Sequence, residues 1–437
     1  MAYYAGITEE AVEMERRVYP AHEKVPLRIT PRGKHYRRFE GKWRVTMVPM
    51  EISANSFMDP EMNAAGEGYY DSFTLTPENG ELVFDYVFKD EEEWAVVLSS
   101  LEDEKLKLTL HVYSLEADLF ARSPYIGDLH THSCFSDGDE EPVLVAANHR
   151  KAGYDFIALT DHHQYAPSVE LEAYLAPLPV EFRVFRGEEV HLKSAQYMHV
   201  VNFGSRYSVN DLHNADIAKA DSEVRALMPT LDVPPTLDQY EAAYRVWTAE
   251  RIREAGGMAI IAHPFWRTRH EYNMRPEMVK WLFEKGYYDA FEVISGQSVF
   301  ENNLQTALYG DMRSEGTKVP VVGSSDCHKS SDPGTYFKFG MTFAFAEELT
   351  AESVIDAVKN HFSAAMETAN GRIYGTYRMV KYALFLKKYY LPHHDELCIE
   401  EGLRLAAYYK DETDPEEAFG GTCGRVAEYL GRFMGKE

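Results

Sequence analysis

The stretch that decides the fold is YIGDLHTHSCFSDG, residues 125–138. It opens as a short apolar run, and the H-x-H pair His130 and His132 follows this run. Side chains two residues apart on a strand point to the same side, so these two imidazoles can bind one metal ion. An H-x-H pair alone is more often structural than a ligand pair, so its weight depends on the rest of the chain.

Short apolar runs alternate with helical stretches along the next two hundred or so residues. Runs that are apolar on both faces suit parallel strands covered by helices. The further runs lie at residues 156–159, 182–185, 199–203, 258–262, 290–294 and 319–322. The helical stretches lie at residues 140–152, 237–255, 276–285, 301–313 and 351–361. This repeated strand-then-helix order predicts an α/β barrel.

Histidines and acidic residues gather where these runs end. The carboxyl ends of parallel strands share one face of a barrel, so residues far apart in the sequence meet there. The residues at these positions are His130, His132, Asp161, His162, Glu189, His263, Asp326 and His328, and His199 opens the 199–203 run. A lone histidine is more often a core or surface residue, but this repeated placement is hard to obtain by chance. We therefore expect a metal site.

The segments before and after the barrel have different patterns. Residues from about 25 to 118 read as all-β, with Asn79-Gly80 between two alternating runs, which is typical of a hairpin. A second hairpin is expected from residues 94–98 and 105–113. After about residue 370 the strand signal disappears and the chain reads as helical.

Together these patterns predict an α/β protein in three parts. A β-rich, sandwich-like domain is expected over residues 1–122, the barrel over residues 123–368, and a helical C-terminal extension over residues 369–437.

The composition of the chain limits the classes of partner that the protein can bind. The 437 residues include 45 Lys and Arg against 70 Asp and Glu, a formal charge of −25. Such a charge disfavours long duplex DNA or an anionic membrane as the main partner, but a short phosphorylated substrate held by metal ions is compatible with it. The four cysteines form no C-x-x-C pair, and no apolar run approaches the roughly 18 residues of a membrane span. We expect a soluble, cytoplasmic protein.

The sequence resembles the PHP (polymerase and histidinol phosphatase) superfamily of metal-dependent phosphoesterases over about residues 125–361. The motifs that carry the resemblance are DLHTH with a following SDG, LTDH, GEE, HVVNFG, IAHP and SSDCH, in that order. The resemblance implies a distorted seven-stranded barrel with two or three metal ions at the strand carboxyl ends. Asp137 stands where many members have histidine, and this version resembles the branch that acts on nucleoside bisphosphates and short oligonucleotides.

The resemblance also implies a set of metal ligands. One ion would be held by His130, His132, Glu189 and Asp326. Glu189 would bridge to a second ion, bound by His199 and His263, and a third would be held by Asp137, His162 and His328. Mixed imidazole and carboxylate ligands suit Mn, Zn or Fe better than Mg or Ca. Two such ions sharing Glu189 would activate a water for in-line attack on phosphorus.

Other residues are candidates for catalysis and substrate binding. Alongside Glu189, His263 and Asp326, His163 is a candidate catalytic residue. His163 and His191 could each protonate the leaving group, although both could equally be structural. Candidates for binding the substrate phosphate are Arg267, Arg269 and Lys329, although loop cations are usually solvated. Asp161 could orient a ligand imidazole, or it could simply cap the turn at the strand end.

We therefore expect a metal-dependent hydrolase that cleaves a phosphomonoester or a terminal phosphodiester of a small phosphorylated metabolite, nucleotide or short oligonucleotide. An amidohydrolase-type reaction stays open, because that class also uses an H-x-H barrel with a final Asp, although Glu189, His199 and the Asp326-x-His328 pair favour phosphorus. A non-catalytic metal-binding module that engages a protein partner is the second alternative, against which the intact ligand positions argue. The physiological substrate, the choice of metal and the oligomeric state stay open.

Overall fold

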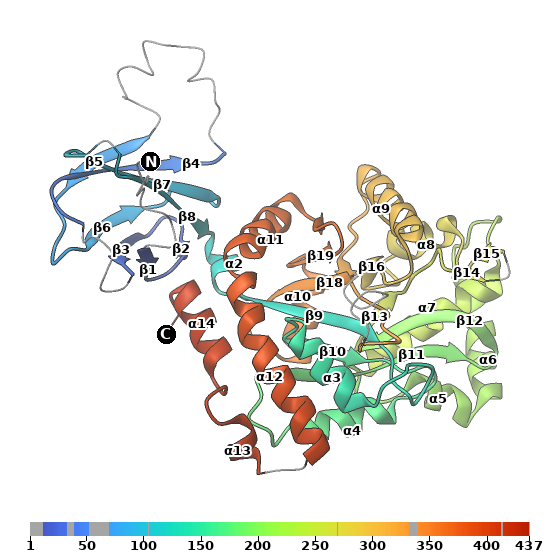
Figure 1. Cartoon of the computed structure of the whole chain (residues 1–437). Helices are drawn as coiled ribbons and strands as arrows, with labels where there is room; N and C mark the ends of the chain where they lie inside the picture. The colour runs from blue at the N-terminus through green and yellow to red at the C-terminus, as the bar shows by residue number, and fades with distance from the viewer. Residues whose placement is uncertain are drawn as a thin grey trace. The chain divides into compact units, whose positions relative to one another are not determined.

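The computed structural model describes residues 12–32, 39–51, 70–103, 105–268, 270–331, 340–411 and 414–436. The chain forms two compact units, one of Met1–Ala121 with Ala427–Glu437 and the other of Arg122–Val426. Figure 1 labels the helices and strands of both. The three-part division expected from the sequence stays a prediction.

Two β-sheets make up most of the first unit. One has the order β1 (Val12–Met14), β3 (Lys24–Pro31), β6 (Leu82–Val87). The other has the order β2 (Val18–Pro20), β8 (Lys107–Leu115), β7 (Glu93–Ser100), β4 (Trp43–Pro49), β5 (Asp71–Leu75), and a short helix, α2 (Ala117–Phe120), follows β8. Exposed and buried residues alternate along β3, and one apolar core takes side chains from both sheets. This confirms the β-rich N-terminal part.

One of the two expected hairpins is correct and the other is wrong. β7 pairs with β8 in antiparallel register, as expected. Asn79 and Gly80 do form a tight turn, with φ of 53° and 82°. However, β5 before the turn pairs with β4, and β6 after it pairs with β3. The turn carries the chain from one sheet to the other, and turn chemistry alone does not reveal which partner a strand takes.

Seven strands of the second unit follow one another around a nearly closed, barrel-like sheet. They are β9 (Ser123–Thr131), β10 (Phe156–Leu159), β11 (Arg183–Leu192), β12 (Ala195–Phe203), β13 (Met258–Ile261), β16 (Ala290–Ile294) and β17 (Val321–Gly323). β12 runs antiparallel to both of its neighbours. Thr131 bridges to Cys327, and the backbone N–H of His132 donates to the Cys327 carbonyl at 2.9 Å. The distorted seven-stranded barrel is therefore confirmed.

The sheet continues beyond the barrel through three strands that the sequence did not reveal. β18 (Gly340–Ala346) pairs with β9, and β19 (Ser363–Glu367) and β20 (Arg372–Gly375) follow it, all antiparallel. β18 and β19 are rich in Ala, Gly and Met. Ala and Gly are depleted in strands, so propensity marks these segments poorly.

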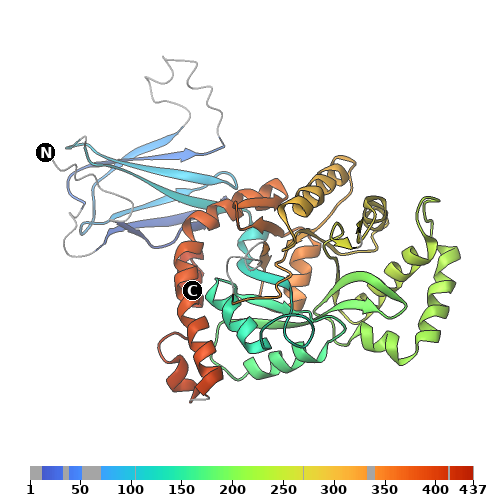
Figure 2. The ribbon, with the colours of Figure 1, turned by 45° about the vertical axis from the view of Figure 1, so that its right-hand side comes forward.

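Helices surround the strands of this unit (Figures 1 and 2). The five expected ones are present as α3 (Pro142–Lys151), α7 (Gln239–Glu254), α8 (Pro276–Glu284), α9 (Val299–Ser314) and α10 (Ala351–Lys359). Four further elements, not expected, are α4 (Ala166–Leu175), α5 (Val209–Ala215), α6 (Ile217–Leu227) and the 3₁₀ turn η3 (Met228–Thr230). These helices are short and bury few apolar side chains, so periodicity gives little signal for them.

The C-terminal helices begin with α11 (Tyr377–Tyr389) and α12 (Leu391–Asp411), followed by α13 (Pro415–Phe419) and α14 (Arg425–Met434). α12 packs closely along α3 of the barrel. The contact is tightest at Gly402, where a Cβ would approach the carbonyl oxygen of Ala147 to 2.6 Å. A buried ion pair joins Arg150 of α3 to Glu401 of α12. Within the expected helical extension, α12 is thus held against the barrel by packing and by charge.

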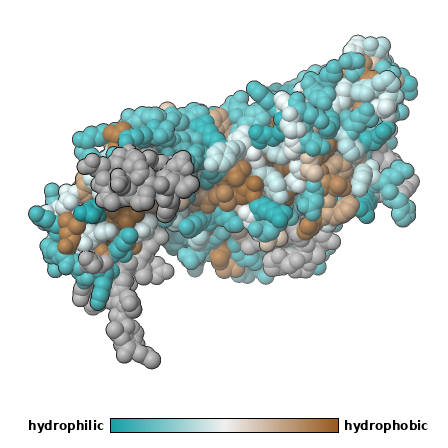
Figure 3. Space-filling model, turned by 90° about the horizontal axis from the view of Figure 1, so that it is seen from above, coloured by the Kyte–Doolittle hydropathy of each residue, from teal (hydrophilic) through white to brown (hydrophobic). Residues whose placement is uncertain are grey.

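The face seen in Figure 3 is mostly polar, and apolar residues appear on it as separate patches. Within the described ranges, the longest helices are too short or too polar to cross a bilayer.

Candidate metal centre

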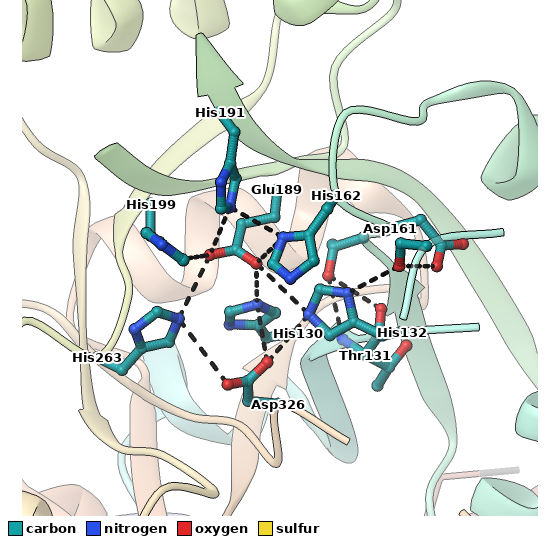
Figure 4. Close-up of polar contacts among 12 residues, drawn as sticks. His130, Thr131, His132, Asp161, His162, Glu189, His191, His199, His263 and Asp326 are labelled. Carbon is teal, nitrogen blue, oxygen red and sulfur yellow. Dashed lines mark hydrogen bonds and ion pairs between the residues drawn. The ribbon is translucent and has the colours of Figure 1, made fainter. Parts of the chain in front are cut away.

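Side chains from six strands meet at one end of the barrel-like sheet (Figure 4). They come from the ends of β9, β10, β13 and β17 and from within β11 and β12, and they are His130, His132, His162, Glu189, His191, His199, His263 and Asp326. The convergence expected from the sequence is therefore present. The role of each residue as a ligand stays a prediction.

Two of these residues, and the neighbour of a third, have strained backbones. His163, His263 and Asp326 have φ of 59°, 22° and 48°, in the left-handed region that residues with a Cβ rarely occupy. Strain of this kind is held only where the surrounding structure demands it, and it clusters at functional sites. Here it follows directly after the strands β10, β13 and β17.

The deeper of two four-residue donor groups consists of His130, Glu189, His263 and Asp326. All four side chains are buried, and their donor atoms lie within 4.8 Å of one another. The Nε2 of His130 is 3.2 Å from Glu189 Oε2 and 3.3 Å from Asp326 Oδ1. Two imidazoles and two carboxylates at this spacing form a set that can surround one cation.

The second group lies nearer to the surface and consists of His132, Asp137, His162 and His328. The Asp137 carboxylate is the centre of the group, with Oδ1 3.2 Å from His328 Nε2 and Oδ2 3.4 Å from His162 Nε2. The side chain of Asp137 is 55% exposed, so this group opens to solvent. His132 joins the two groups, because its Nε2 also lies 3.0 Å from Asp326 Oδ1.

Glu189 stands between the groups with both oxygens engaged. Oε2 lies 3.2 Å from His130 Nε2 and 2.9 Å from His162 Nδ1. Oε1 lies 2.6 Å from His199 Nδ1 and 3.3 Å from His263 Nε2. One carboxylate thus reaches imidazoles of both groups and also His199, which belongs to none of the compact groups among the described residues.

The charges of the cluster suit metal ions. Burial raises the pKa of Glu189 and Asp326, but the surrounding imidazoles outweigh it and hold both pKa values well below the ordinary range. Burial lowers the pKa of His162, yet Glu189 and Asp137 raise it to about 10. At His199 burial prevails, and its pKa falls to about 3. Two ionised carboxylates in a buried site require positive charge beside them, and the donor set fits metal ions in that role.

A buried carboxylate that the sequence did not single out lies behind the cluster. Glu292, in the middle of β16, places Oε2 2.9 Å from His130 Nδ1. This contact leaves the other nitrogen of His130 facing Glu189 and Asp326, as a second layer behind a metal ligand does. The available signal was an acid inside the otherwise apolar run AFEVI.

The contacts of Asp161 are with the loop that follows His132, and its role toward a ligand imidazole stays a prediction. Its carboxylate accepts hydrogen bonds from the backbone N–H and hydroxyl of Ser133, both at 2.7 Å, and from the hydroxyl of Ser136. It therefore fastens this loop. The loop is held because Asp161 supplies the acceptors that its N–H and hydroxyl groups need.

Two of the expected substrate-binding residues, Arg267 and Lys329, have their described contacts outside the donor groups. The guanidinium of Arg267 lies 4.2 Å above the ring of Phe300 and 5.9 Å from that of Tyr272. Lys329 pairs with Asp139 at 3.1 Å. Arg269 lies outside the described residues. The substrate roles of all three stay predictions.

A cavity of about 1000 Å³ lies beside the donor groups rather than on them. Its lining includes Arg267, His270, Glu271, Tyr272, Met274, Arg275 and Pro276, around the small strands β14 (Arg267–Thr268) and β15 (Glu271–Tyr272). Trp266 directly precedes Arg267 of the cavity lining, and its ring lies 5.0 Å from that of His199 and 6.1 Å from that of His263.

A further compact group, Asp155, His394 and Cys398, lies where α12 meets the barrel. The guanidinium of Arg150 donates to Asp155 Oδ1 at 2.9 Å, and the same oxygen lies 2.9 Å from His394 Nε2. A buried cation is thus already in place, so this group is explained as part of the ion pairing that holds α12.

Comparison with known proteins gives distant structural likenesses. No family model matches the sequence, and no curated protein matches it. A two-domain protein of Bacteroides vulgatus, which contains a predicted PHP-like metal-dependent phosphoesterase, is 17% identical over 57% of this chain and 66% of its own, with a TM-score of 0.40. A protein of Bifidobacterium adolescentis, provisionally named a metal-dependent phosphoesterase, is 16% identical over 53% and 94%, with a TM-score of 0.35.

An amidohydrolase of Chromobacterium violaceum, with bound sulfate and no metal, is 21% identical over 48% of this chain and 89% of its own, with a TM-score of 0.32. This chain thus spans about two thirds of the first of the three structures. TM-scores of this size carry no argument about activity, and the case for a function rests on the geometry of the donor groups.

Proposed function

We propose that this protein is a PHP-type metal-dependent phosphoesterase, which hydrolyses a phosphomonoester or a terminal phosphodiester of a small phosphorylated metabolite, nucleotide or short oligonucleotide. The observation that carries the proposal is the position of Glu189, whose two oxygens contact imidazoles on both sides of a buried donor cluster. A shared carboxylate of this kind is what holds two cations at the short separation that phosphoryl transfer uses.

The cluster would hold two or three divalent ions of Mn, Zn or Fe. The deeper group and the outer group each supply four donors, and His199 adds an imidazole on the Oε1 side of Glu189. When bound, such ions polarise phosphoryl oxygens and lower the pKa of water. Nitrogen-rich donor sets favour these metals over Mg and Ca.

The protein's own residues position and shield the reaction. Glu189, His130, His263 and Asp326 are buried, so bulk water is excluded from the base of the site. The open, half-exposed side at Asp137 is where a phosphate would enter. Burial and the neighbouring imidazoles of His191 and His162 lower the pKa of His163. The neutral His163 that results suits accepting a proton near the rim and returning it to the leaving oxygen.

The cavity next to the centre supports a nucleotide-like substrate. Its volume of about 1000 Å³ is at the upper end of the range that small-molecule sites occupy. The rings of Phe300 and Tyr272 are 48% and 42% exposed, and the guanidinium of Arg267 lies over Phe300. Exposed rings can stack a planar base, while a guanidinium can hold a phosphate through two parallel hydrogen bonds.

The test is hydrolysis by the full-length protein after loading with Mn, Zn or Fe. We expect release of p-nitrophenol from its phosphate ester and turnover of nucleoside monophosphates or bisphosphates. Asp326→Asn should lower kcat/KM by about a thousandfold, whereas the surface variant His393→Ala should not change it. If the metal-loaded protein cleaves amides or lactones but no phosphate ester, an amidohydrolase is the better description. If the metal-loaded protein cleaves none of these substrates, a non-catalytic metal-binding module is the better description.

A further inference from the structure

His191 is an imidazole of the cluster that the expected ligand set does not include. It lies two residues after Glu189 on β11, and both side chains are directed into the cluster (Figure 4). Its side chain is almost fully buried and reaches toward Glu189 and His162 (Figure 4).

The distances around His191 are close to those between the donor atoms of a coordination shell. Its Nε2 lies 2.9 Å from His162 Nδ1 and 3.4 Å from Glu189 Oε1, and His162 Nδ1 lies 2.9 Å from Glu189 Oε2. These three residues form a compact donor group of their own. Donor atoms about 2.1 Å from one ion, at tetrahedral or octahedral angles, are separated by roughly 3.0–3.4 Å.

The backbone holds His191 in this position. Its N–H donates to Asn210 Oδ1 at 3.1 Å. The Asn210 amide in turn donates to the buried Glu188 carboxylate at 3.1 Å and to the Glu189 carbonyl at 3.3 Å. Glu188, which directly precedes Glu189, thus anchors α5 against β11. A donor fixed from behind in this way is preorganised for a ligand in front of it.

His162 can serve this group as well as the outer one. Its Nε2 faces Asp137 at 3.4 Å, while its Nδ1 faces Glu189 and His191. In a simple hydrogen bond between His162 and His191, one ring donates a proton and the other accepts it through an unprotonated nitrogen. The Glu189 carboxylate would then lie beside that unprotonated nitrogen, so that two acceptors face each other. A cation between the three donors satisfies all of them at once.

We propose that His191 is a metal ligand, which together with Glu189 and His162 holds a cation at this corner of the cluster. The inference rests on the metal centre of the proposed function and is independent of the substrate. It replaces the role of proton donor that the sequence left open for His191, and it gives this chain one imidazole more than the expected ligand set.

The experiment measures metal binding rather than turnover. The full-length protein is stripped with a chelator and titrated with Zn or Mn against a competing indicator, and bound metal is counted by elemental analysis. We expect His191→Ala to lose one bound equivalent or to bind it at least tenfold more weakly. The control is His393→Ala, an exposed histidine of α12 that lies in none of the compact groups of the described residues. It should keep the wild-type count and affinity.

Two further measurements separate a ligand from a hydrogen-bonding neighbour. His191→Gln keeps an acceptor for His162, so full recovery of the wild-type affinity in this variant would overturn the proposal. X-ray absorption of the Zn-loaded protein should show fewer imidazoles per Zn in His191→Ala than in wild type, and equal numbers would also overturn it.

Circular dichroism of the metal-free variants establishes that they are folded. If wild type hydrolyses no phosphate ester but His191→Ala still loses metal, the proposed function fails and this inference stands.

Discussion

The Nδ1 of His130 lies 2.9 Å from Oε2 of Glu292, and neither side chain is accessible to solvent. Burial raises the pKa of Glu292 and the charge of His130 opposes this. A carboxylate behind a ligand imidazole fixes which nitrogen carries the proton and increases the basicity of the other.

Glu292→Gln should therefore weaken metal binding without emptying the site. The amide keeps the size of the side chain but removes its charge, and we expect the affinity for the first ion to fall by about 10- to 100-fold. Competition with a chelating indicator measures it. Glu284→Gln, at the exposed end of α8, is the control and should match wild type. An unchanged affinity in Glu292→Gln would mean that His130 does not depend on Glu292.

Arg267→Ala should reduce substrate affinity more than turnover. The guanidinium lies over the exposed ring of Phe300 and lines the cavity, away from the donor groups. A lost hydrogen bond to a charged group costs about 1.5–3 kcal/mol, so KM for a nucleoside phosphate should rise about tenfold or more. We expect kcat to change less than KM. Steady-state kinetics measures both constants. Arg225→Ala, which removes an exposed arginine of α6, is the control. A loss confined to kcat would contradict the prediction.

Most of the candidate site could be predicted because its residues lie at the ends of strands. His130, His263 and Asp326 follow apolar runs directly, and the carboxyl ends of neighbouring parallel strands must meet. Glu292 lies inside such a run, where an acid among apolar residues is unusual but does not show that the side chain faces the cluster. Contacts such as that of Asp161 with Ser133 depend on how a loop folds back, which no periodicity describes.

The same reasoning explains what could be predicted of the fold. Strands that are apolar on both faces carry a strong signal, and β10, β13 and β16 are completely buried. The expected pairing of β5 with β6 is wrong, because a turn fixes only the local direction of the chain. Which sheet a strand joins depends on packing between residues far apart in the sequence.

His394→Ala should destabilise the protein more at low pH than at high pH. His394 is buried on α12, with Nε2 2.9 Å from Asp155 and Nδ1 3.0 Å from Asp395. Burial lowers its pKa, but Asp155 and the other neighbours raise it well above the ordinary 6.5. A raised pKa in the folded state gives stability that is complete below pH 6.5 and is lost as the pH rises through the folded value.

Removing one partner of a buried pair costs about 3–5 kcal/mol, so we expect a loss of that order for His394→Ala near pH 6. The difference from wild type should shrink as the pH is raised through the folded-state pKa of His394, which lies well above 6.5. Urea unfolding at several pH values measures it. His393→Ala, the exposed neighbour that pairs with Glu396, is the control and should show little loss at any pH. A difference that grows with pH would show that His394 is neutral in the folded protein.

Gly402→Ala tests whether α12 must lie directly against α3. In the middle of a helix, Gly→Ala is normally stabilising by up to about 1 kcal/mol. At position 402, however, the new Cβ would come within 2.6 Å of the Ala147 carbonyl and still closer to the backbone nitrogen of Lys151, distances that real Cβ atoms do not show. Overpacking of this kind costs about 1–3 kcal/mol, so the net effect should be a loss of stability.

Gly310→Ala in α9 is the matched control, since nothing lies within 4 Å of its Cβ position, and it should stabilise the protein. Denaturant unfolding of both variants measures the sign directly. If both were stabilised, the backbones of α12 and α3 would not be in contact, and the ion pair between Arg150 and Glu401 would have to hold the helices without close packing.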